Sequence, residues 1–202
     1  MKNWKVIAPL ALTAAGALAT GLAVLLKKTD EAAPAGEKAA PAAKPIDPAR
    51  LKTGSYSFIS GYKDAATVEM SVCYDGEAFS YAVVEDEFLA ESSDSHVALL
   101  YGEDFNLQFE YAPFFGGENF TAHRASLAEK HADLKDAAFG ENRGLQYLAG
   151  DNVCIHLPIP GDAHSYLLVT LMKSPDNDED FTALPEHPDV QAMLGSLRFQ
   201  II

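Results

Sequence analysis

Histidines are the residues of this sequence best suited to bind a metal or transfer a proton near neutral pH. There are six of them, at His96, His123, His131, His156, His164 and His187. No two have the i, i+4 spacing of a helical zinc motif, and a His-Glu-x-x-His segment is absent. We therefore predict no metal site, and expect each histidine to face solvent or to be hydrogen-bonded. His156, within a predicted strand, is the first histidine to inspect for binding.

The known catalytic and nucleotide-binding motifs are absent. The sequence has no Gly-x-Ser-x-Gly elbow, no phosphate-binding loop and no Gly-x-Gly-x-x-Gly fingerprint. Neither Cys73 nor Cys154 lies in a recognisable catalytic cysteine–histidine context. We therefore predict no catalytic residue and no cofactor, and a non-enzymatic role is favoured.

The acidic segment Asp176–Asp180 resembles the start of a calcium-binding loop. An EF-hand loop beginning at Asp176 needs glycine at its sixth position and glutamate at its twelfth, where this chain has Phe181 and His187. The interpretation is a solvated acidic loop.

Two adjacent aromatic residues, Phe114 and Phe115, precede the pair Gly116-Gly117. Aromatic side chains beside a flexible loop can line a groove, or the loop can turn them into the core. With His156, Phe114 and Phe115 are the candidate binding residues of the sequence.

The two cysteines, Cys73 and Cys154, each lie in a strand-like run, out of phase with the most apolar neighbours. Both thiols should then lie on sheet faces opposite those apolar sets. An even count in an exported domain permits one disulfide. A Cys73–Cys154 disulfide and two separate reduced thiols are left as equal alternatives.

Alternating apolar residues predict about five antiparallel strands in the first half of the chain. The pair Asp75-Gly76 predicts a hairpin turn between two of them. The predicted strand segments begin near Thr53 and continue through 67–74, 78–84, 96–101 and 106–112.

The second half combines helices and strands. A helix is predicted over 120–134, capped by Asn119, and a shorter one opens at Pro188 with apolar residues at i, i+3, i+4 and i+7. Strands are predicted at 145–148, 153–159, 165–172 and 197–202, the third of them central and the last tucked into the sheet by its apolar end. This order predicts an α+β fold, an antiparallel β-sheet with two flanking helices.

The segment Val6–Leu26 is apolar and contains no charged residue. As a helix it would be about 30 Å long, the thickness of a bilayer's hydrocarbon core. Lysines flank both ends, so charge barely decides its orientation, and the short N-terminal side favours an inside N-terminus. We predict an uncleaved signal anchor, a single transmembrane helix within residues 1–28; the alternative is a cleaved signal peptide and a secreted domain.

Three segments are therefore expected. Residues 1–28 form the anchor, 29–52 an Ala/Pro/Lys-rich linker that cannot build a core, and 53–202 an extracytoplasmic α+β domain. The predicted localisation is the cell membrane, with the membrane contacted through the N-terminal helix.

Charge excludes one class of partner. The chain carries 15 basic and 29 acidic residues; residues 1–47 hold six lysines and four acids, so residues 48–202 have a net charge of −16. Such a domain repels phosphate backbones, and we predict that it does not bind nucleic acid. Cationic ligands would be attracted, although many domains are acidic only for solubility.

The closing segment Pro188–Phe199 reads Pro-Asp-Val-Gln-Ala-Met-Leu-Gly-Ser-Leu-Arg-Phe. Together with the order of elements, this helix–strand ending resembles Mog1/PsbP-like domains. That resemblance implies an antiparallel sheet flanked by helices and a non-catalytic binding or assembly role. It assigns no functional residue.

The functional hypothesis is a membrane-tethered extracytoplasmic domain that acts in binding or envelope assembly through an unidentified protein or small-molecule partner. The alternative is an exported hydrolase whose active site has no known motif.

Overall fold

The computed structural model describes most of the predicted extracytoplasmic domain. The described residues are 45–59, 67–85, 96–114, 118–174 and 180–202. The predicted anchor 1–28, most of the linker, Phe115 and residues 176–179 of the acidic loop lie outside them. Within the described residues, no helix has the length and apolar character needed to cross a membrane.

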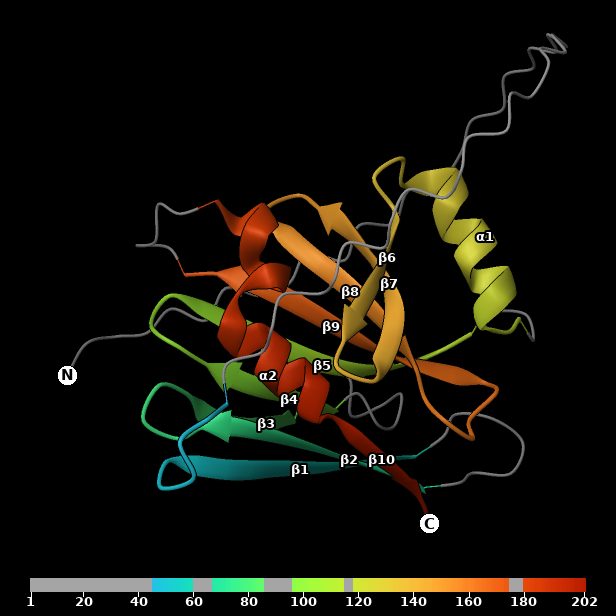
Figure 1. Cartoon of the computed structure of the whole chain (residues 1–202). Helices are drawn as coiled ribbons and strands as arrows, with labels where there is room; N and C mark the ends of the chain where they lie inside the picture. Colours follow the sequence, from blue (N-terminus) through green and yellow to red (C-terminus); the bar gives the residue numbers. More distant parts are fainter. Residues whose placement is uncertain (1–44, 60–66, 86–95, 115–117, 175–179) are drawn as a thin grey trace, which may run out of the picture. The chain divides into compact units, whose positions relative to one another are not determined.

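The described chain is built mainly from strands, with few helices (Figure 1). The first five strands precede the first helix: β1 (Leu51–Ile59), β2 (Thr67–Asp75), β3 (Ser80–Glu85), β4 (His96–Tyr101), β5 (Phe105–Pro113) and α1 (Phe120–Lys130). The remaining elements are β6 (Lys135–Phe139), β7 (Asn142–Ala149), β8 (Asn152–Pro158), β9 (Ser165–Lys173), the 3-10 helix η3 (Phe181–Glu186), α2 (Pro188–Ser196) and β10 (Arg198–Ile201).

These strands form two antiparallel sheets. The first has three strands in the order β1-β2-β10, and the second has seven in the order β3-β4-β5-β9-β8-β7-β6. The α+β class is confirmed, with two sheets where the sequence predicts one. The central position predicted for β9 is also confirmed, because it pairs with β5 and β8.

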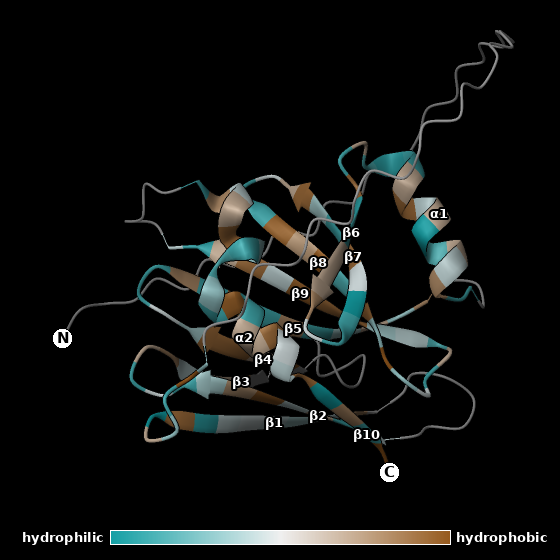
Figure 2. Cartoon of the chain, viewed as in Figure 1, coloured by the Kyte–Doolittle hydropathy of each residue, from teal (hydrophilic) through white to brown (hydrophobic). Residues whose placement is uncertain are grey.

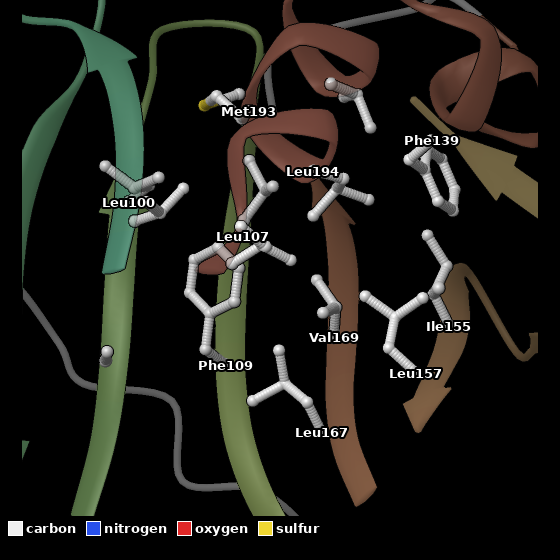
Figure 3. Packing of buried hydrophobic residues seen from close by; sticks show 14 of the residues in the cluster. Leu100, Leu107, Phe109, Phe139, Ile155, Leu157, Leu167, Val169, Met193 and Leu194 are labelled. Carbon is white, nitrogen blue, oxygen red and sulfur yellow. The ribbon is translucent and has the colours of Figure 1, made fainter. Parts of the chain in front are cut away.

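Strand alternation builds the core. Along β2, buried and half-buried residues strictly alternate, which places Val68, Met70 and Val72 on the buried face. Figure 2 shows the hydrophobic residues along β8 and β9 that continue this core in the larger sheet. Met193 and Leu194 of α2 are fully buried against it (Figure 3).

The hairpin predicted at Asp75-Gly76 is wrong. The turn exists, since the Phe79 N–H donates to the Asp75 carbonyl at 2.9 Å, and Arg50 holds the Asp75 carboxylate at 3.0 Å. However, β2 pairs with β1 and β10, and β3 pairs with β4. Because β10 occupies the edge of β2 that a hairpin partner would need, the turn carries the chain from one sheet to the other.

Two further predictions need correction in the middle of the chain. The α1 helix ends at Lys130, with His131 extended and its N–H bonded to the Leu127 carbonyl, so Leu134 is not helical. The strand β6, which the sequence does not predict, follows directly and pairs with β7. The predicted cap is confirmed, because the Asn119 side chain accepts the Ala122 N–H at 3.1 Å.

The closing helix and strand form as predicted. The spacing in α2 buries Val190, Met193 and Leu194, and β10 pairs with β2. Just before β10 begins, Ser196 also bonds to β2: its Oγ accepts the Cys73 N–H at 2.8 Å. The C-terminus joins the sheet as predicted, since the Ile202 N–H donates to the Thr67 carbonyl at 2.9 Å, although Ile202 itself is 69% exposed.

Candidate functional site

One face of the seven-stranded sheet carries polar residues on its central strands. Residues directly opposite each other in adjacent strands share a face. Gln108, Thr170, Cys154 and Tyr147 form one such row across β5, β9, β8 and β7. Glu110, Leu168, His156 and Leu145 form the next row. We call this side the outer face, because the opposite side carries the apolar core.

The helix α1 lies beside β7 (Figure 1) and contacts the outer face through histidine and aromatic side chains. Leu127 is the only residue of α1 that is fully buried. His123 packs on His156 and Tyr166, Phe120 packs on Phe114, and Arg124 forms an ion pair with Asp136 of β6. Just past the helix, His131 stacks on Tyr147 with ring centroids 3.8 Å apart.

A chain of hydrogen bonds links α1 to the sheet. His123 Nε2 lies 2.8 Å from His156 Nδ1, and His156 Nε2 lies 3.2 Å from the Tyr147 hydroxyl. Neutral histidine carries one proton on two ring nitrogens, so the chain can run in either direction. In one order the Tyr147 hydroxyl donates to His156, which donates to His123; in the other order each donor becomes an acceptor. The arrangement thus joins three groups without any net charge.

Burial keeps this histidine pair neutral. The pKa of His156 is lowered to about 3, mainly because the ring is buried and further because His123 and His131 are close. Burial also lowers the pKa of His123, against the opposing influence of Glu118. Both imidazoles are therefore uncharged at neutral pH.

The neighbouring tyrosine and cysteine side chains are likewise uncharged. Burial is the main cause that raises the pKa of Tyr166, to about 12, and that raises the pKa values of Tyr147 and Cys154. The Cys154 thiol is hydrogen-bonded to Tyr147 and Thr170. A thiol with a raised pKa is mostly protonated at neutral pH and is a poor nucleophile.

Glu110 of β5 is a carboxylate on the central strands of the outer face. Burial of its side chain raises its pKa, and a hydrogen bond from Gln108 partly offsets this effect. Among the residues that the structure describes, it has no ion-pair partner. It is close enough to Cys154 and Tyr166 to raise the pKa values of both.

A hollow adjoins one end of the hydrogen-bonded chain. It measures about 480 Å³ and lies at the part of β7 that extends beyond its pairing with β6. Tyr147 lines it together with Asp133 and Glu186. The Asp133 carboxylate already accepts the Leu148 N–H at 2.7 Å.

The structure brings two of the three sequence candidates together. Phe114 is buried, with its ring 5.4 Å from His123 and 5.2 Å from Tyr166, and Tyr166 stacks on His156 at 4.8 Å. The third candidate, Phe115, lies outside the described residues. The sequence did not identify His123, Tyr147 or Glu110; the contact between His123 and His156 spans 33 positions and leaves no short-range signal.

The two cysteines lie in different sheets, and both are free thiols. Cys73 lies in β2, where its sulfur is 3.7 Å from the Thr53 hydroxyl. Cys154 lies in β8 among Tyr147 and Thr170. As predicted, each lies on the face opposite its apolar neighbours. Of the two alternatives, the structure has separate thiols.

Of the other histidines, His131 stacks on Tyr147. His164 is exposed, and His187 caps α2 by accepting the Asp189 N–H at 3.2 Å. No group of three or more histidine, cysteine, aspartate or glutamate side chains is placed to hold a metal ion among the residues described.

Comparisons with models of protein families, with curated proteins and with solved structures give no match to this chain.

Proposed function

We propose that this chain is a membrane-tethered, extracytoplasmic binding module without catalytic activity, and that its ligand binds at the outer face beside α1. The observation that carries the binding proposal is the row of half-buried polar residues across the central strands. Gln108, Glu110 and Thr170 are half-buried, so ligand atoms can reach them. Ligand-binding sites usually combine apolar side chains with a few convergent polar groups.

The electrostatics of the cluster favour binding over the alternative of an exported hydrolase. A general base works best with a pKa near the working pH, whereas burial lowers the pKa of His156 to about 3. A cysteine nucleophile needs a lowered pKa, whereas that of Cys154 is raised. These neutral groups suit the donation and acceptance of hydrogen bonds to a ligand.

The proposed localisation rests on the sequence of residues 1–52. An uncharged apolar segment, Val6–Leu26, is long enough to span a bilayer, and the Ala/Pro/Lys-rich linker that follows would hold the domain away from the surface. The net charge of −16 beyond residue 47 would repel anionic headgroups and nucleic acid. The alternative is secretion of the domain after cleavage of a signal peptide.

The proposed relationship to Mog1/PsbP-like domains agrees with this role. It is supported by the closing segment Pro188–Phe199, which forms α2 and the start of β10, and by the antiparallel strands. An assembly role in the cell envelope is the corresponding functional analogy.

Fractionation of cells that express the full chain, followed by intact-mass measurement of the recovered protein, tests the localisation. Full-length protein in the membrane fraction, with the domain open to externally added protease, supports the tether. A shorter soluble exported form supports the secreted alternative. Full-length soluble protein inside the cell would overturn both proposed localisations.

Site-specific photo-crosslinking in cells tests the binding face. A benzoylphenylalanine replaces Leu99, a half-buried residue of the outer face opposite Gln108, and a matched one replaces Ser57, an exposed residue of β1. We expect a discrete adduct from position 99 that is absent at position 57. Equal adducts at both positions, or none at position 99, would refute the outer face as the binding surface.

A further inference from the structure

The side chain of Glu110 has no counter-charge among the residues that the structure describes. It lies in the middle of β5, half-buried, between Val97 of β4 and Leu168 of β9. Burial raises its pKa, and the described residues contain no ion-pair partner for it. A carboxylate withdrawn from water without a cation is costly, and a bound cation would remove that cost.

On the outer face around Glu110, the described strand residues supply hydrogen-bond acceptors and no cation. The outer-face positions of β4, β5, β8 and β9 that the structure describes include no lysine or arginine. Gln108 precedes Glu110 on the same face, and Thr170 lies opposite Gln108. Their side-chain oxygens and the carboxylate give three acceptors on neighbouring positions.

Apolar and aromatic residues complete this environment. Leu99 and Leu168 flank the acceptors on the adjacent strands. Tyr166 is close enough to Glu110 for the carboxylate to raise the tyrosine pKa. The Tyr166 ring is itself covered by His123, His156 and Phe114, so the apolar surface beside the acceptors comes from the leucine side chains, which favour an alkyl chain.

From these contacts we propose that Glu110, Gln108 and Thr170 form a binding site for a primary alkylammonium group, as carried by a diamine or by a lysine side chain. An ammonium group has three donors on one small nitrogen, which matches three acceptors, whereas guanidinium is a planar fork. The absence of a three-ligand metal group in the described residues favours the organic cation over a metal. The net charge of −16 beyond residue 47 raises the local concentration of such cations.

This inference rests on the proposed binding role and names its ligand class. The test is calorimetric titration of the full chain in nonionic detergent, at constant ionic strength, with putrescine and separately with N-acetyl-lysinamide. 1-Butanol is the neutral control. We expect an ammonium ligand to bind with a Kd of about 1 mM or tighter, as is reasonable for a fragment of this size. Binding of putrescine alone identifies a free diamine; binding of N-acetyl-lysinamide adds the lysine side chain.

Two variants of equal charge separate the site from general attraction. Glu110→Gln removes the carboxylate of the site, and Glu103→Gln removes an exposed one in the turn before β5. We expect Glu110→Gln to weaken ammonium binding at least tenfold and Glu103→Gln to leave it within twofold. Since glutamine relieves a buried charge, Glu110→Gln should unfold no earlier than the wild type.

The proposal is overturned if neither amine binds the wild type, if butanol binds as well as the amines, or if both variants bind alike. None of these results changes the crosslinking expected at position 99. Failure of the ligand class can therefore be told apart from failure of the binding face.

Discussion

Acidification should weaken the fold through His156. The ring is buried, its Nδ1 lies 2.8 Å from His123 of α1, and its Nε2 lies 3.2 Å from Tyr147 of β7. Tyr166 of β9 stacks on it, and His131 is close enough to lower its pKa further. No carboxylate is among the described groups that shift its pKa, so none of them would compensate a proton on this ring.

The linkage between protonation and folding gives the sign and size of this loss of stability. The pKa of His156 is about 3 in the folded chain and about 6.5 when unfolded, so the unfolded state binds the proton more strongly. Stability from this group is complete above pH 6.5 and falls as the pH drops toward 3. Between pH 7 and pH 5 the loss is about 2 kcal/mol. The lowered pKa of His123 adds a loss of the same sign.

Urea unfolding at pH 7 and pH 5, followed by circular dichroism, measures this loss. Carboxylates elsewhere also titrate, so the informative quantity is the difference between variants. We expect His156→Gln to reduce the pH-dependent loss by about 2 kcal/mol relative to the wild type. The exposed His164→Gln should retain the wild-type loss.

One result would refute the reasoning. If His156→Gln and His164→Gln show the same pH-dependent loss as the wild type, the imidazole of His156 is not held neutral by burial, and the electrostatic case for a neutral binding cluster fails with it.

Three further changes test the packing around the site. Gly144→Ala would drive a Cβ into the backbone carbonyl of His156, so we expect a loss of about 3 kcal/mol and weakened β7–β8 pairing, measured by urea unfolding and amide exchange; unchanged stability would contradict this close approach. Ser196→Ala should cost about 1–2 kcal/mol in thermal unfolding, because the Cys73 N–H loses its acceptor, and Ser196→Thr should restore part of it. Asn119→Ala should cost about 1 kcal/mol and increase exchange in the first turn of α1, whereas Asn119→Asp should not.

Local patterns in the sequence predicted most individual elements. The alternation at Val68, Met70 and Val72 predicted β2 because one face of a strand is buried and the other is not. The spacing of Val190, Met193 and Leu194 predicted α2 for the corresponding helical reason. These signals are contained in nine residues or fewer.

The assignment of strands to sheets was not predictable in the same way. A turn such as Asp75-Gly76 specifies a reversal, but the partner of β2 is decided by β10, more than a hundred residues later. The strand β6 was missed because its sequence, Lys-Asp-Ala-Ala-Phe, has few large apolar residues. Tertiary pairing with β7 overrides this weak propensity.

The binding face was only partly visible in the sequence. Phe114 and His156 could be named because each stands out in its own segment. Glu110 is one of 29 acidic residues, and the lack of a cation beside it among the described residues depends on which strands flank β5. The pairing of His123 with His156 depends on where α1 packs, which its own sequence does not specify.

The position of β10 in the smaller sheet affects how the chain folds during synthesis. This strand follows every other described strand in the chain, yet it pairs with β2, the second of them. During synthesis from the N-terminus, the hydrogen-bonding groups on that edge of β2 must wait for almost the entire domain to be made. Pairings between such distant segments are slow, and an open edge invites contact with other chains. A chain that stops before Arg198 would therefore keep a permanent aggregation-prone edge, however well its larger sheet has folded.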